Sequence, residues 1–234
     1  MKQHIYAAVL IAAGMIVNNA AFAQPVADCG SPNPLSASTD FGSLAGYGAD
    51  GCIQQDKIYR SFDGTLPASQ PVTIATLLDI PIVGEDTHTV TIGAISNPAG
   101  SGAPLVYTFS YSIEIDPSLI DFASRFIKEV TIGADVPAGT TGVSVVKNVS
   151  DAGGGLLATL TSIDGTQDSI SGLHESKLLI SETITVNPGA ALFSSTDTYL
   201  QQVAPLPEPA SASLFGLGLA AMSFSRRRKL PASA

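Results

Sequence analysis

The clearest pattern in the chain is a strict alternation of apolar and polar side chains over Leu105–Ile115. Successive side chains of a strand point to opposite faces, so this run predicts a half-buried antiparallel strand. A helix would distribute the same aromatic residues around its cylinder. The side chains expected on the buried face are Tyr107, Phe109, Tyr111, Ile113 and Ile115.

Six further runs show a weaker period of two and are also predicted to be strands. They are residues 57–62, 87–95, 125–132, 142–149, 156–163 and 178–186. Three of the apolar rows include a charged residue, and one of these is Lys128, between Phe126 and Val130. Lys147 follows Val143 and Val145, and Glu182 shares a face with Ile180, Ile184 and Val186.

Turn-forming residues separate these runs. They include Asn97-Pro98, Asp135-Val136-Pro137, Gly153-Gly154-Gly155, Asp164-Gly165 and Asn187-Pro188-Gly189. Short β-rich runs with such turns are typical of an all-β fold, and we expect an antiparallel β-sandwich of the jelly-roll or Ig-like kind. The other segments are predicted to be an irregular lead-in (24–51), a turn or two of helix within 116–126, and an extended linker (201–209).

The first 23 residues have the organisation of a secretory signal peptide. A short positive leader precedes the apolar run Ile5–Val17, and Ala21-Phe22-Ala23 forms an A-x-A cleavage pattern before Gln24. Such segments are removed on export, so signal peptidase is an expected partner. We expect the mature chain to begin at Gln24 and its folded domain to span residues 24–204.

The last thirty residues contain a second short apolar segment. Residues 210–224 carry no charge. As a helix they would reach about 22 Å, short of the roughly 30 Å hydrocarbon core. The following Arg226, Arg227, Arg228 and Lys229 favour the cytoplasmic side, and Pro207 and Pro209 favour extended backbone. The pattern predicts a weak membrane helix behind an accessible peptide, with a permanent membrane anchor as the alternative.

This tail resembles the PEP-CTERM sorting signal. The resemblance rests on Pro207-Glu208-Pro209, the apolar segment and the Arg-rich end, within residues 205–234. It implies export, processing by a membrane protease-transpeptidase called exosortase, and passage from an inner-membrane intermediate to the cell surface or the medium. It also implies a structural or interaction role linked to exopolysaccharide or biofilm. It assigns no activity to residues 24–204.

The charge balance excludes some partners. Apart from Lys2 and the four tail cations, the chain has six basic and twenty acidic residues, a balance of −14. Such a surface disfavours binding to nucleic acid and to anionic membranes. The two cysteines, Cys29 and Cys52, predict a disulfide in an oxidising compartment. A metal site would need more ligands than two distant thiols supply.

Candidate catalytic residues are few. After signal removal, only the histidines His88 and His174 remain, and no G-x-S-x-G motif is present. We expect no enzyme activity and no cofactor, although a Ser-His-Asp arrangement is defined by geometry rather than by sequence order. Asp164 and Asp168 offer carboxylates for Ca²⁺, but Asp164-Gly165 is more simply a turn, so no metal is expected.

Glycan binding is the second functional hypothesis, and a hydrolase is the third. Sugars commonly stack on exposed aromatic rings, yet the chain has no Trp. Tyr47, Tyr59 and Tyr199 are the candidate exposed rings, because Tyr107 and Tyr111 fit a buried face. A site that relies on hydrogen bonds would need no such ring.

Overall fold

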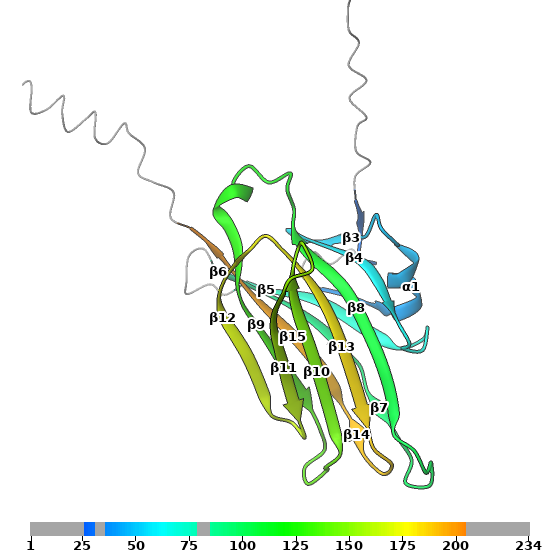
Figure 1. Cartoon of the computed structure of the whole chain (residues 1–234). Coiled ribbons are helices and arrows are strands. Elements are labelled where there is room, and N and C mark those ends of the chain that lie inside the picture. Colours follow the sequence, from blue (N-terminus) through cyan, green and yellow to red (C-terminus); the bar gives the residue numbers. More distant parts are fainter. Residues whose placement is uncertain (1–25, 31–35, 79–84, 205–234) are drawn as a thin grey trace, which may run out of the picture.

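Two antiparallel sheets packed face to face make up the computed structural model, which describes residues 26–30, 36–78 and 85–204 (Figure 1). The first sheet has seven strands in the order β1-β3-β4-β8-β13-β10-β11. Their bounds are β1 (Ala27–Asp28), β3 (Cys52–Gln54), β4 (Lys57–Gly64), β8 (Leu105–Ile115), β13 (Lys177–Val186), β10 (Val143–Asp151) and β11 (Leu156–Ile163).

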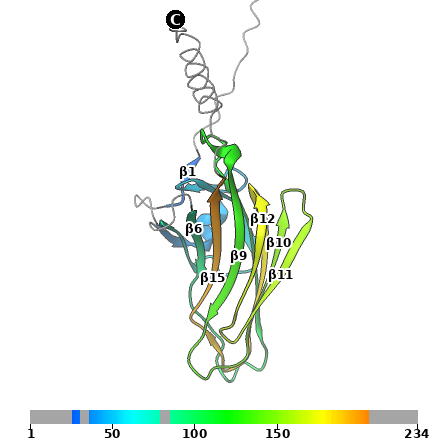
Figure 2. The ribbon, with the colours of Figure 1, turned by 90° about the vertical axis from the view of Figure 1, so that its left-hand side faces the viewer.

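The second sheet has six strands in the order β12-β9-β15-β6-β5-β2. Figure 2 shows β6, β15, β9 and β12 side by side. The bounds are β12 (Gln167–Glu175), β9 (Arg125–Asp135), β15 (Ser194–Val203), β6 (Glu85–Ile92), β5 (Pro71–Leu78) and β2 (Ser36–Asp40). A two-stranded ladder pairs β14 (Ala191–Leu192) with β7 (Ile95–Ser96).

The all-β sandwich predicted from the alternating pattern is confirmed. Every strand pairing described is antiparallel except that of β1 with β3. Strand β8 occupies the predicted residues and pairs with β13 along its length, from Leu105 opposite Val186 to Glu114 opposite Lys177. The triple-glycine segment joins β10 to β11 as an antiparallel hairpin, as expected.

The core lies between the two sheets. On β8 the side chains of Phe109, Tyr111, Ile113 and Ile115 are buried, whereas Tyr107 is only half-buried. Phe109 packs against Phe41, Phe62 and Tyr111, with ring centroids 5.1–6.1 Å apart. This aromatic group joins the end of the sandwich that carries α1 (Phe41–Gly46) to its centre.

Some elements differ from the prediction. The segment 24–51 is not wholly irregular, because it contains β1, β2 and α1. Asp40 precedes helix α1 as its N-cap, and its side chain accepts a hydrogen bond from the Ser43 amide. The expected linker at Gln201 is wrong in part, since β15 continues to Val203. Within 116–126 the chain forms turns and a short 3-10 helix, η1 (Phe122–Ser124).

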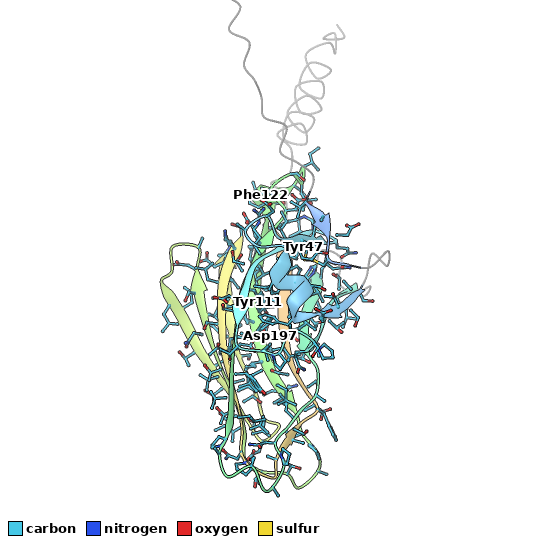
Figure 3. The ribbon with its side chains drawn as sticks, turned by 90° about the vertical axis from the view of Figure 1, so that its right-hand side faces the viewer. Tyr47, Tyr111, Phe122 and Asp197 are labelled. Carbon is cyan, nitrogen blue, oxygen red and sulfur yellow. A yellow bond between two sulfur atoms is a disulfide. The ribbon has the colours of Figure 1, made fainter. Side chains whose placement is uncertain are left out.

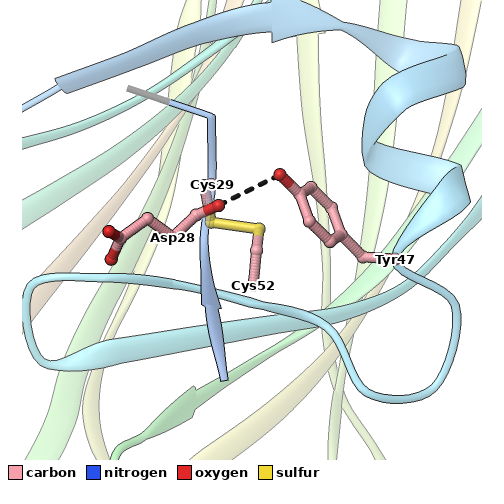
Figure 4. The surroundings of a disulfide bond; sticks show 4 residues. All are labelled: Asp28, Cys29, Tyr47 and Cys52. Carbon is pink, nitrogen blue, oxygen red and sulfur yellow. Dashed lines mark hydrogen bonds between the residues drawn. A yellow bond between two sulfur atoms is a disulfide. The ribbon is translucent and has the colours of Figure 1, made fainter. Parts of the chain in front are cut away.

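The predicted disulfide joins Cys29 to Cys52 and connects β1 to β3 (Figure 4). Both cysteines are fully buried. Beside it, the Tyr47 hydroxyl donates to the Asp28 carbonyl oxygen at 3.0 Å. The N-terminal part of the described chain is therefore fastened to β3 by the disulfide and to the end of α1 by the Tyr47 hydrogen bond.

The signal peptide, the cleavage residues Ala21, Ala23 and Gln24, and the tail from residue 205 lie outside the described residues. Within the described ranges, no helix is long and apolar enough to cross a membrane.

Candidate functional site

The outer face of the six-stranded sheet carries rows of hydroxyl side chains. Along β5, β6 and β15, inward residues such as Ile74, Val90 and Tyr199 are buried, so the alternate positions face outward. Strand register aligns those outward positions across the sheet. One row comprises Ser38, Thr73, Thr91 and Thr196, and a second includes Thr89, Thr198, Thr131 and Ser169.

A hollow of about 370 Å³ opens in this face, over β9 and β15. Gly133 lies opposite both Thr196 and Gln167, and its lack of a side chain leaves space between them. A Cβ built at Gly133 would lie 3.4 Å from the Gln167 side chain. The polar residues that line the hollow are Thr131, Asp135, Gln167, Ser194, Thr196 and Thr198.

A second hollow of about 280 Å³ lies on the same sheet, at the other end of β9 and β12. Here the rings of Phe126 and His174 stack with their centroids 3.8 Å apart. Lys128, Glu129 and Gln202 supply polar groups around this pair. His174 lies within β12, and its side chain is exposed.

An ionic network fills one end of the space between the sheets. It comprises Asp56, Lys57, His88, Arg125 and Gln201, and is called the Asp56 network below. Asp56 Oδ1 lies 2.9 Å from Lys57 Nζ, and Oδ2 accepts from Arg125 Nη1 at 2.9 Å and from Gln201 Nε2 at 2.8 Å. His88 Nδ1 lies 3.1 Å from the Thr76 hydroxyl, and Nε2 lies 3.2 Å from Asp56.

Burial and neighbouring charges move the pKa values in this network. Burial, assisted by Lys57, lowers the pKa of His88 to about 3, so its ring is neutral. Burial alone would raise the pKa of Asp56, but Lys57 and His88 hold it at about 2. The pKa of Lys57 falls to about 8 because its ammonium is desolvated.

Asp56, Asp86 and His88 offer ligand atoms within 4.8 Å of one another, the kind of group that can hold a cation. Both oxygens of Asp56 already contact cationic side chains, Lys57 and Arg125. A divalent ion would have to displace these partners against their positive charge. We therefore interpret the network as an internal set of ion pairs that joins the two sheets.

The remaining predicted site residues are dispersed. Asp164 Oδ1 accepts from the Val143 amide and Asp168 Oδ2 from the Thr161 amide, so both carboxylates bind backbone. Of the three tyrosines expected to be exposed, Tyr59 and Tyr199 are fully buried, and that interpretation of them is wrong. Tyr47 is half-buried beside the disulfide.

Fold and surface together define a two-sheet β-sandwich protein with an open, hydroxyl-rich hollow on one sheet. The C-terminal tail indicates how the cell sorts the protein. Residues 205–229 match the PEP-CTERM protein-sorting motif, which includes Pro207, Glu208, Pro209 and the four cations from Arg226 to Lys229. The chain thus carries a PEP-CTERM sorting signal, as its resemblance implied. The motif implies an exported protein that passes through the membrane and is processed there by signal peptidase and exosortase.

No curated protein matches the chain. Solved structures with some similarity include the enzymatically active domain of tailspike protein 4 of bacteriophage CBA120 (12% identity, TM-score 0.24, covering 62% of this chain and 19% of that one). Another is an arabinose-bound MgGH51 α-L-arabinofuranosidase (11% identity, TM-score 0.24, covering 59% of this chain and 22% of that one). A third is the CBM22-1 xylan-binding domain of Paenibacillus barcinonensis Xyn10C (14% identity, TM-score 0.23, covering 72% of this chain and 94% of that one). The chain spans about a fifth of the first two. These TM-scores support no conclusion about fold or activity.

Proposed function

We propose that this exported protein has a structural or interaction role at the cell surface or in the extracellular matrix, and that it associates there with polysaccharide. The observation that carries the proposal is the hydroxyl-rich face with its hollow at Gly133. Hydroxyl, amide and carboxylate side chains supply both donors and acceptors, which match the hydroxyl groups of a sugar chain.

The expected ligand is a neutral polysaccharide. The strong acidic balance of the chain disfavours an anionic polymer, and Asp135 places a carboxylate beside the hollow. The aligned rows extend across several strands, so a long chain has room to make many weak contacts. Such binding would be of the kind expected for a matrix component.

We further propose that the protein is not an enzyme. His88 is fully buried and neutral, which suits an internal hydrogen-bond role rather than proton transfer to a substrate. His174 is exposed, but its ring stacks on Phe126. The check is an assay for release of reducing ends from the host's polysaccharide. Release above the level of a denatured sample would contradict this part of the proposal.

The binding proposal is tested by co-sedimentation of the purified protein with exopolysaccharide of the native host and with a neutral β-glucan. We expect saturable binding that Gly133→Leu reduces at least tenfold, because a leucine fills the hollow. Thr183→Leu, on the exposed face of β13 in the other sheet, is the matched control and should bind as wild type. Equal binding by both variants, or no binding by the wild type, would contradict the proposal that polysaccharide binds at the hollow.

A further inference from the structure

A second charged group lies buried at the centre of the sandwich, away from the Asp56 network. Lys147 on β10 and Glu182 on β13 are direct cross-strand partners in the first sheet. Asp197 projects inward from β15 in the second sheet, near Tyr111 (Figure 3). The exposed fractions of the three side chains are 0%, 1% and 3%.

The lysine amine directly contacts the aspartate carboxyl group. Lys147 Nζ meets Asp197 Oδ1, and Glu182 Oε1 lies 3.6 Å from the same Nζ. The other aspartate oxygen, Oδ2, accepts from the Tyr111 hydroxyl at 2.6 Å, with the Tyr199 hydroxyl at 3.4 Å. The phenols therefore fix the carboxyl group by one oxygen while the other faces the amine.

Burying Lys147, Asp197 and Glu182 as separate charges costs free energy of desolvation. The neighbouring inward residues on the same strands, Val145, Val149, Ile180 and Ile184, are buried and apolar. Lys147 Nζ, Asp197 Oδ1 and both carboxylate oxygens of Glu182 have no hydrogen bond among the described residues. Buried ions are retained when hydrogen bonds replace their lost hydration, and here that replacement is confined to Oδ2 of Asp197, which accepts from Tyr111. A reaction that removes the charges would therefore be favoured.

We propose that Lys147 and Asp197 condense to an intramolecular isopeptide bond that joins the two sheets. Lys147 Nζ attacks Cγ of the Asp197 carboxyl group, and a C–N bond forms. One C–O bond of Asp197 then breaks, and its oxygen leaves as water with two protons taken from the starting ammonium. The products are one secondary amide and one water molecule, with no change of oxidation state and no further reactant.

Glu182 is placed to carry the proton in this reaction. Burial and the charge of Asp197 raise the pKa of Glu182 well above its usual value, so it is available as a neutral acid. It contacts the attacking nitrogen, from which it receives a proton as another is passed to the departing oxygen. The fixed contact between amine and carboxyl group replaces a bimolecular encounter, and the apolar surroundings limit access of water for the reverse reaction.

The other buried lysine provides an internal comparison. Lys57 is also fully buried, but its partner Asp56 has both oxygens in ion pairs or hydrogen bonds and is 14% exposed. These partners and the access of water stabilise the Asp56 carboxylate against attack by the amine. We therefore expect the bond at Lys147 alone.

The test is peptide mapping of the full chain, purified in folded form as verified by near-UV circular dichroism. After reduction of the disulfide and trypsin digestion, an unlinked chain yields peptides 129–147, 148–177 and one beginning at Leu178. A linked chain resists cleavage at Lys147, so peptide 129–177 stays intact and is joined to the peptide that begins at Leu178. The mass of this product is lower by one water than the sum of its two peptides. Fragment ions should place the bond between Lys147 and Asp197. Three separate peptides, or a bond to Glu182, would overturn the proposal.

Variants separate the roles. Lys147→Arg should yield only unlinked peptides, whereas the matched control Lys57→Arg should retain the link. Glu182→Gln keeps the size of the side chain but cannot take up a proton, so we expect at least a hundredfold loss in the rate of bond formation. Unchanged linking in this variant would remove Glu182 from the reaction, because a purely structural role predicts no effect on the covalent bond.

Discussion

Replacing His88 with glutamine should remove much of the acid sensitivity of the fold. His88 is buried between Thr76 and Asp56, with Lys57 and Arg125 nearby, and its pKa falls from 6.5 to about 3 on folding. Protonation therefore favours the unfolded chain. The stability that the neutral ring contributes is fully present above pH 6.5 and is lost as the pH falls toward 3.

The magnitude follows from the width of this pH window. Each pH unit below 6.5 costs roughly 1.4 kcal/mol while the unfolded histidine is charged and the folded one is neutral. Between about pH 6.5 and 4.5 the wild type should lose about 2 kcal/mol more than His88→Gln. Asp56 is ionised in both proteins over this window, and the opposite contribution of Glu182 is common to both.

The assay is urea unfolding of both proteins at several pH values, followed by fluorescence of the tyrosines. The quantity of interest is the difference in unfolding free energy between wild type and variant as a function of pH. Glutamine can still donate to Asp56 and can donate to or accept from the Thr76 hydroxyl, which limits other losses. A difference that stays constant with pH would refute the assignment of a buried neutral His88.

Three other outcomes are expected. Replacing both Cys29 and Cys52 with serine should lower the unfolding free energy by about 3 kcal/mol, measured by urea unfolding, because the unfolded chain gains freedom; no change would contradict this. Phe109→Ala should cost about 3–5 kcal/mol by leaving a cavity among aromatic rings, whereas the exposed Val106→Ala on the same strand should be nearly neutral. Mass spectrometry of protein from the native host should find Gln24 at the start and no Arg-rich end. A tail that persists at the membrane when Pro207-Glu208-Pro209 is altered would instead identify a permanent anchor.

The alternation of apolar and polar side chains predicted strands such as β8, whose inward-facing residues are apolar. Strand β8 is the best example, because Phe109, Ile113 and Ile115 form an unbroken inward row. Strand β15 was missed for the opposite reason, since its inward residues Ser195, Asp197 and Gln201 are polar. Strand β12 has one buried residue and therefore no periodic signal.

The candidate sites were less accessible to sequence reasoning. Lys147 and Glu182 were visible as charges within apolar rows, which is a signal of buried polar groups. Their partner Asp197 is fixed only by the packing of one sheet on the other, and that information is absent from local periodicity. The hollow at Gly133 likewise depends on the register of three strands, β12, β9 and β15.

The position of β15 affects when the protein can fold. The strand lies between β9 and β6, yet it is the last strand of the described residues, and the sorting tail follows it directly in the sequence. During export from the N-terminus, the six-stranded sheet exists only as the separate pieces β12-β9 and β6-β5-β2, each with an unpaired edge. Native pairing of this sheet can finish only after β15 has crossed the membrane. Slow translocation or early proteolysis would therefore expose strand edges to aggregation.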